Sequence, residues 1–120
     1  MLELRQARCI PCSGKPSQRP DAEQQELLKQ LPAWQIIEFE GVARLQRVFH
    51  FGNFAQALAF ANDIGKLAEA ADHHPALLTE WGKLTVSWWT HSCAGLQLND
   101  FILAARCDLL SETAEGLRQS

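Results

Sequence analysis

The 120-residue chain lacks the features of a membrane protein, an exported protein and a general nucleic-acid binder. No apolar run approaches the roughly 20 residues needed to cross a bilayer, and polar residues interrupt positions 1–10, where an export signal would have its apolar core. A positive charge excess is also missing, since 11 Lys and Arg stand against 14 Asp and Glu. We therefore expect a cytoplasmic protein that neither enters a membrane nor binds nucleic acid directly.

The sequence contains four cysteines but no export signal that would favour a disulfide framework. The cysteines are Cys9, Cys12, Cys93 and Cys107. In a chain without an export signal we expect free thiols, because the cytosol keeps cysteines reduced. The Cys9-x-x-Cys12 spacing is half of a zinc knuckle, but Cys93 and Cys107 are too far apart in the sequence to supply the other half. Structural zinc and thioredoxin-type redox chemistry are left as alternatives with little support.

The N-terminal part differs from the rest in composition. Proline, glycine and serine concentrate between Cys9 and Pro20, a composition typical of irregular segments. We predict an irregular N-terminal extension over residues 1–20 and one folded domain over residues 21–120.

Residues 21–120 carry the periodicities of helices and strands in alternation. Helical spacing predicts helices over 22–31, from the cap Asn53 to Asp72, and over 98–114. Strands are expected over 34–39, 42–51, 76–81 and 83–91, with short turns at Glu40-Gly41 and Gly82. The predicted fold class is α+β in the order α-β-β-α-β-β-α, with a four-stranded antiparallel sheet and three helices on one face.

Alternation within two strands separates a core side from a solvent side. In strand 42–51 the core side holds Ala43, Leu45, Phe49 and Phe51, with Arg47 as an exception, and the other side holds Arg44, Gln46 and His50. In strand 83–91, Leu84, Val86 and Trp88 share the core side. We expect this strand to present His91 and Trp89 on the opposite side.

Three of the four histidines lie between Glu69 and Asp100, at predicted ends of helices and strands. Pro75 disfavours the helical conformation for His74, so His73 and His74 leave the helix in an extended conformation with diverging side chains. Together with His91 they place several titratable groups at element ends, where sites usually form. Solvated surface histidines and a three-histidine zinc site are the alternatives.

Three motifs carry a family resemblance. They are Glu69-Ala-Ala-Asp72-His73-His74-Pro75, Trp88-Trp89-Thr90-His91-Ser92-Cys93-Ala94-Gly95-Leu96 and Asn99-Asp100-Phe101. Together they resemble the pterin-4a-carbinolamine dehydratases. The Cys9-x-x-Cys12 extension and Leu78-Thr-Glu-Trp81-Gly82-Lys83 most resemble the bacterial type associated with phenylalanine hydroxylase. The resemblance covers roughly residues 21–114, so the predicted domain 21–120 is a pterin carbinolamine dehydratase-like domain.

The resemblance implies an enzyme that dehydrates 4a-hydroxytetrahydrobiopterin to quinonoid dihydropterin, recycling the cofactor of aromatic amino-acid hydroxylases. It implies no metal and no cofactor, with the pterin as substrate. His73 and His74 would be the proton-transfer pair, and His91 would bind and orient the pterin. These catalytic histidines would share the binding of the pterin with Asp72, Trp89, Thr90 and Ser92. Asp100 and Glu69 would support the histidines.

The same resemblance implies partners. Family members assemble into dimers and tetramers, so we expect a homodimer or homotetramer, with an aromatic amino-acid hydroxylase as a further candidate partner. Some members also bind a transcription factor. A transcriptional coactivator without essential catalysis is therefore the alternative function.

Overall fold

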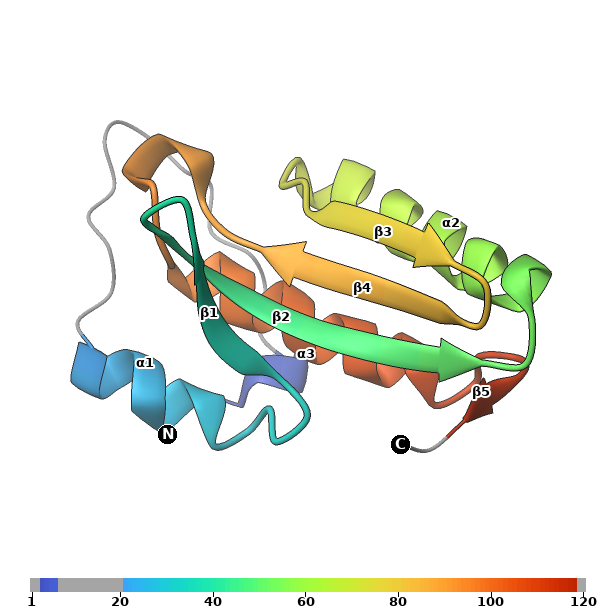
Figure 1. Cartoon of the computed structure of the whole chain (residues 1–120). Coiled ribbons are helices and arrows are strands. Elements are labelled where there is room, and N and C mark those ends of the chain that lie inside the picture. Colours follow the sequence, from blue (N-terminus) through green and yellow to red (C-terminus); the bar gives the residue numbers. More distant parts are fainter. Residues whose placement is uncertain (1–2, 7–20, 119–120) are drawn as a thin grey trace.

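The computed structural model describes residues 3–6 and 21–118, and these form an α+β fold (Figure 1). Helices span α1 (Asp21–Leu28), α2 (Phe54–Ala71) and α3 (Leu98–Ser111), with short 3-10 helices at Leu4–Gln6 and His91–Cys93. Strands span β1 (Gln35–Phe39), β2 (Val42–Phe51), β3 (Ala76–Glu80), β4 (Lys83–Trp88) and β5 (Leu117–Arg118). No helix in the described part of the chain is both long enough and apolar enough to span a membrane.

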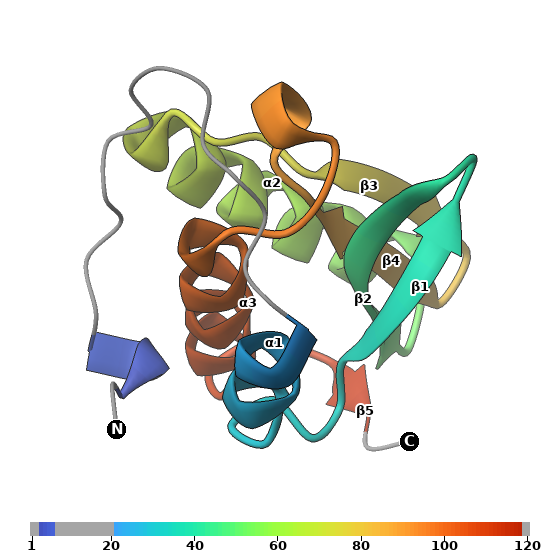
Figure 2. The same ribbon diagram turned by 90° about the vertical axis from the view of Figure 1, so that its left-hand side faces the viewer.

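The sheet has the strand order β1-β2-β4-β3, with every neighbouring pair antiparallel. All three helices lie on one side of it, with α2 and α3 packed against its face (Figure 2). This confirms the predicted fold class. The sequence did not indicate β5, which extends the sheet by pairing with the last two residues of β2.

The two hairpins of the sheet, β1–β2 and β3–β4, are each closed by a tight turn. Glu40 and Gly41 adopt positive φ angles of 50° and 80°, the backbone that a two-residue hairpin turn requires. The turn therefore sets the β1–β2 register in which Phe39 faces Val42. The Gly82 turn, with a φ of 76°, does the same between β3 and β4.

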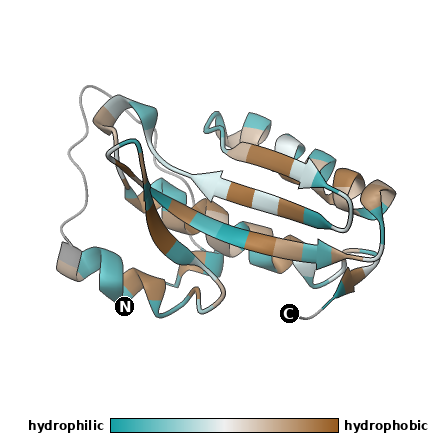
Figure 3. Cartoon of the chain, viewed as in Figure 1, coloured by the Kyte–Doolittle hydropathy of each residue, from teal (hydrophilic) through white to brown (hydrophobic). Residues whose placement is uncertain are grey.

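The core lies between the sheet and helices α2 and α3. Leu84, Val86 and Trp88 are fully buried, as the predicted alternation requires, and the changing hydropathy along the strands is visible in Figure 3. Phe49 of β2 packs edge-on against Phe60 of α2, with their ring centroids 5.0 Å apart. The sheet thus has one apolar side under the helices and one side open to solvent.

Arg47, the charged exception on the core side of β2, is explained by Asp108 of α3. The Arg47 guanidinium donates to Asp108 Oδ1 at 2.5 Å, and the Trp34 indole donates to the same oxygen at 2.8 Å. Burial raises the pKa of the Asp108 carboxyl, opposed by these two donors. The group ties β2, α3 and the chain before β1 together.

Several predicted boundaries were wrong near element ends. Helix α1 ends at Leu28 instead of residue 31, and α3 ends at Ser111 instead of residue 114. After both ends the backbone N–H groups bond three residues back, as in a tightening last turn. The strand predicted over 83–91 stops at Trp88.

The N-terminal segment and the cysteines are described in part. Leu4 is fully buried in the core, whereas Cys9, Cys12 and most of the predicted extension lie outside the described residues. Cys93 and Cys107 form no disulfide within the described part of the chain. Burial raises the pKa of Cys107 to about 12, so this thiol is a packing group at neutral pH.

Candidate active site

The candidate site residues gather at the end of the sheet where β4 finishes. Helix α2 ends just before His73, β4 ends just before Trp89, and α3 begins at Leu98 (Figure 1). The antiparallel register places Trp88 opposite Leu45, near the beginning of β2. Three element ends thus bring together residues separated by up to 31 positions in the sequence, from Glu69 to Asp100.

The end of α2 determines how His73 enters the core. Asp72 adopts the left-handed conformation, with φ 51° and ψ 44°, and its backbone N–H bonds back to the last turn of the helix. The His73 N–H bonds to the Ala68 carbonyl at 3.1 Å, the long hydrogen bond typical of a helix ending in this way. His73 is only 8% exposed and stacks on Trp88, with ring centroids 5.9 Å apart. Asp72 itself is exposed.

Asp100 joins His73 to the other two segments of the site. Its Oδ1 lies 2.6 Å from His73 Nε2, and its Oδ2 accepts the Thr90 hydroxyl at 2.7 Å and the Gln97 backbone N–H at 2.8 Å. The last contact belongs to a capping box at the beginning of α3. The carboxyl is fully buried, so three donors compensate for its loss of water. Asp100 thus contacts a histidine and also lies at the N-terminus of α3, while its role in supporting that histidine stays a prediction.

His74 has a different environment from its neighbour. Its side chain is 53% exposed, and Nε2 lies 2.9 Å from Oε2 of Glu69, which is 79% exposed. His73 and His74 therefore bind different carboxylates, in agreement with the diverging side chains that the sequence predicts. His73 is therefore held in place by burial and by Asp100, whereas His74 is open to solvent.

The prediction that a strand carries His91 was wrong. Beyond Trp88 the chain leaves the sheet, because Thr90 pairs with Gly95 instead of a neighbouring strand and its N–H bonds to the Gly95 carbonyl at 2.8 Å. The enclosed residues form the 3-10 helix His91–Cys93, which ends at Ala94 in the left-handed conformation. His91 and Ser92 are exposed on this turn. The predicted proximity of His91 and Trp89 is observed, with ring centroids 4.6 Å apart.

Sequence reasoning missed Arg44 at this site. Its guanidinium carbon lies 3.8 Å from the Trp89 ring centroid and 4.4 Å from that of Phe39. Alternation had placed Arg44 on the solvent side of β2. The antiparallel register between β2 and β4, which sets Leu45 opposite Trp88, brings the neighbouring Arg44 near Trp89.

The structure thus arranges the predicted residues in three groups. His73, Asp100 and Thr90 form one hydrogen-bonded network, His74 pairs with Glu69, and His91 contacts Trp89. Within residues 3–6 and 21–118, no three His, Cys, Asp or Glu side chains are grouped as metal ligands would be. Imidazoles beside carboxylates can donate and accept protons near neutral pH, so the arrangement suits acid–base chemistry.

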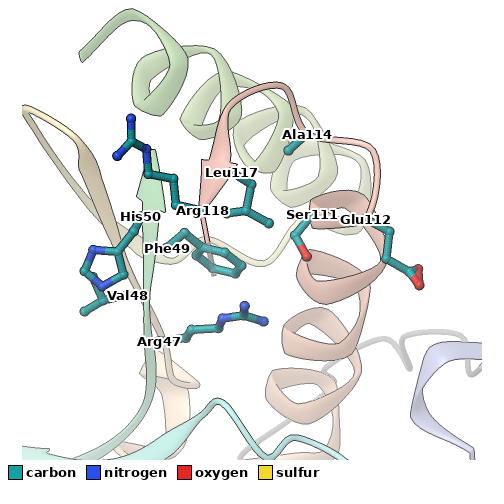
Figure 4. A pocket seen from close by; sticks show the side chains of 9 residues that line it. All are labelled: Arg47, Val48, Phe49, His50, Ser111, Glu112, Ala114, Leu117 and Arg118. Carbon is teal, nitrogen blue, oxygen red and sulfur yellow. The ribbon is translucent and has the colours of Figure 1, made fainter. Parts of the chain in front are cut away.

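A cavity of about 580 Å³ lies elsewhere, between β2, β5 and the end of α3 (Figure 4). It is lined by Arg47, Phe49, His50, Ser111, Leu117 and Arg118, among others. His50 faces Lys83, the first residue of β4, so this cavity and the three clustered histidines are at opposite ends of that strand. The fourth histidine is therefore separate from the candidate site.

Comparison with known proteins gives consistent matches. The family model described as pterin 4 alpha carbinolamine dehydratase matches residues 17–110. A protein of Chlorobium luteolum whose assigned name is pterin-4-alpha-carbinolamine dehydratase is 50% identical over 110 residues, which cover 92% of this chain and 96% of that protein. A crystal structure from Brucella melitensis, described as a transcriptional coactivator/pterin dehydratase, superposes with a TM-score of 0.71 at 28% identity, covering 78% of this chain and 98% of that one.

Proposed function

The chain belongs to the pterin-4a-carbinolamine dehydratase family and is a dehydratase, and we propose that its substrate is 4a-hydroxytetrahydrobiopterin. The products are quinonoid dihydropterin and water, so the enzyme recycles the cofactor of an aromatic amino-acid hydroxylase. The observation that carries this proposal is the match of residues 17–110 to the family, a range that includes all three clustered histidines.

The elimination needs two proton transfers. One proton goes to the 4a-hydroxyl group as its C–O bond breaks, and another leaves the adjacent ring nitrogen as the C=N bond forms. Histidine is suited to both steps because its imidazole gains and loses a proton near neutral pH. We assign the transfers to His73 and His74, and the binding and orientation of the pterin to His91, with Asp72, Trp89, Thr90 and Ser92 along the pterin.

The carboxylates support a common orientation for the two transfer histidines. An ionised carboxylate only accepts hydrogen bonds, so neutral His73 donates from Nε2 to Asp100 and keeps its free lone pair on Nδ1. The same reasoning applies to His74 Nε2 and Glu69. In both histidines Nδ1 is then the atom that exchanges a proton with the substrate. The histidine that serves the 4a-hydroxyl group starts protonated on Nδ1 and donates that proton, whereas the other starts neutral and accepts the proton of the ring nitrogen. A fixed tautomer and ring direction reduce the reorganisation needed during the reaction.

The proposal is tested by mixing purified protein with freshly generated carbinolamine and following dehydration above the uncatalysed rate. We expect the wild type to accelerate it and the double variant His73→Ala/His74→Ala to lose this acceleration. His50→Ala is the matched control, since His50 lies at the other end of the sheet, and it should keep wild-type turnover. A wild type that gives only the uncatalysed rate would rule the proposed reaction out.

We further propose that the reaction needs no metal or organic cofactor, because side-chain imidazoles supply both proton transfers. Treatment with a chelator should leave the turnover unchanged. Loss of turnover on chelation, with recovery on adding zinc, would restore the three-histidine zinc alternative.

For the assembly we propose a homodimer or homotetramer in the cytoplasm, with an aromatic amino-acid hydroxylase as a candidate partner. The supporting feature is β3, which ends the described strand order with one side unpaired and carries the exposed Leu78. Such an edge can pair with a second copy about a two-fold axis. A monomeric mass by light scattering at micromolar concentration would contradict this assembly.

The description of the Brucella structure as a coactivator favours a second candidate function, binding to a transcription factor without essential catalysis. The two functions differ in their response to one variant. The double histidine variant should keep a regulatory partner in a pull-down assay if binding is the function, whereas dehydration should be lost.

A further inference from the structure

Arg44 of β2 contacts two aromatic rings. Its guanidinium lies against Phe39 of β1 and Trp89 beyond β4. Its Nε atom is buried and has no hydrogen-bond acceptor among the described residues. An arginine kept for hydrogen bonding would satisfy this donor, so its ring contacts are the interactions that account for its position.

The contacts continue from Arg44 to the candidate site. Trp89, which Arg44 touches, is also the residue whose ring lies 4.6 Å from His91. His91 is exposed at the beginning of a 3-10 turn, and no described residue hydrogen-bonds to its ring. The Trp89 ring is thus the side-chain contact that the structure describes for the His91 ring, and Trp89, which also packs against the core, is linked to the β1–β2 hairpin through Arg44.

We propose that Arg44 is a positioning residue that holds Trp89 against His91 and so sets the direction in which His91 faces the pterin. This inference rests on the proposed function, because it gives the direction of His91 a role in substrate binding. Arg44 itself contacts the Trp89 ring and acts on the substrate only through it.

The chemistry of the arginine side chain suits this task. A guanidinium is flat and permanently charged, so it can lie parallel to an indole and attract the negative face of the ring. Lysine keeps the attraction but loses the flat contact, and methionine of similar length loses the charge. Arg44→Lys and Arg44→Met therefore separate the two parts of the interaction.

The first test observes the position of His91 without using activity. The carbon-bound ring protons of His91 are measured by NMR, since the adjacent indole shifts them upfield. We expect Arg44→Met to move these resonances toward the values of an unstructured histidine and Arg44→Lys to move them less. Arg118→Met is the matched control, because Arg118 is an exposed arginine on β5, at the opposite end of the sheet, and it should leave them unchanged.

The second test separates binding from chemistry. If His91 orients the pterin, Arg44→Met should raise KM by about 3- to 10-fold, the range that a cation–π contact can supply, while kcat changes by less than about twofold. Arg44→Lys should recover part of the loss. Thermal unfolding measured on the same samples shows whether Arg44→Met is folded at the assay temperature.

Each outcome decides the proposal. Unchanged His91 resonances in Arg44→Met overturn it, as does a fall in kcat at constant KM. If Arg44→Met does not fold, Arg44→Lys is measured in its place. We expect it to shift the His91 resonances and raise KM in the same direction by smaller amounts, and the absence of both changes overturns the proposal. If the wild type shows no dehydration, the proposed function fails, whereas the NMR comparison still decides whether Arg44 positions His91.

Discussion

His73 and His74 are adjacent in the sequence, yet they occupy opposite environments. His73 belongs to a buried group with Asp100 and Thr90, in which every partner lies on a different segment. His74 belongs to an exposed group with Glu69, only five residues earlier. The first group connects the end of α2, the end of β4 and the beginning of α3, whereas the second stays within one helix end.

This difference shows how the site combines rigidity with access. The buried group is fixed by three donors around one carboxylate, so a change there affects both the fold and the chemistry. The exposed group can exchange contacts with substrate and water at low cost, so a change there affects the chemistry alone. We therefore expect substitutions in the buried group to lower both the free energy of unfolding and turnover, and substitutions in the exposed group to lower turnover alone.

The largest effect is expected for Asp100→Asn. The amide replaces an acceptor oxygen with a donor, which then faces either His73 Nε2 or the Thr90 and Gln97 donors. We expect the free energy of unfolding, measured with urea, to fall by about 2–4 kcal/mol, since a buried charged acceptor is lost. Turnover should fall by about 100-fold because His73 loses its orientation.

The control for this variant is Asp63→Asn, an exposed carboxylate on α2 whose loss should be neutral within about 0.5 kcal/mol. An Asp100→Asn protein as stable as this control would mean that the buried group does not hold the site together.

The next effect contrasts His73→Ala with His74→Ala. Both should lower turnover by about 10²- to 10⁴-fold, as expected for the loss of an acid–base group. Only His73→Ala should lower the free energy of unfolding, by about 1–3 kcal/mol, because it leaves the buried Asp100 without one donor. Urea unfolding and turnover measured on both variants test the comparison. Equal stability of the two variants would remove the distinction between the groups.

The sequence was sufficient for most of the fold because the relevant signals are local. Asn53 caps α2 through its own side chain, and Glu40-Gly41 forms the hairpin turn within two residues. The motif resemblance brought the three histidines into one site, and Asp100 was expected to orient a histidine. The roles of these residues stay predictions until activity is measured.

The features that sequence reasoning missed depend on distant parts of the chain. The strand ends at Trp88 because Thr90 pairs with Gly95 and binds Asp100, and neither contact follows from alternation. Strand β5 exists only where the end of β2 is available to pair with it. The place of Arg44 at the site likewise requires the register of three strands, which periodicity alone does not give.

A smaller effect is expected for His91→Gln. The residue is exposed on its 3-10 turn, so the free energy of unfolding should stay within about 0.5 kcal/mol of the wild type. The affinity for a dihydropterin analogue, measured by calorimetric titration, should weaken by about 1–3 kcal/mol if a polar partner in the complex loses its hydrogen bond. A large loss of stability with unchanged affinity would place the pterin elsewhere.

The smallest effect is expected for Glu69→Gln. The Glu69 and His74 side chains are 79% and 53% exposed, so water and salt screen their interaction. Exposed pairs of this kind contribute about 0.2–1 kcal/mol, which corresponds to a fall in turnover of about 1.5- to 5-fold if the contact only orients His74. Raising the salt concentration should bring wild-type turnover toward that of the variant, because screening weakens the same contact. A loss of 100-fold or more would instead show that Glu69 takes part in proton transfer, and the exposed group would then depend on its carboxylate as strongly as the buried group depends on Asp100.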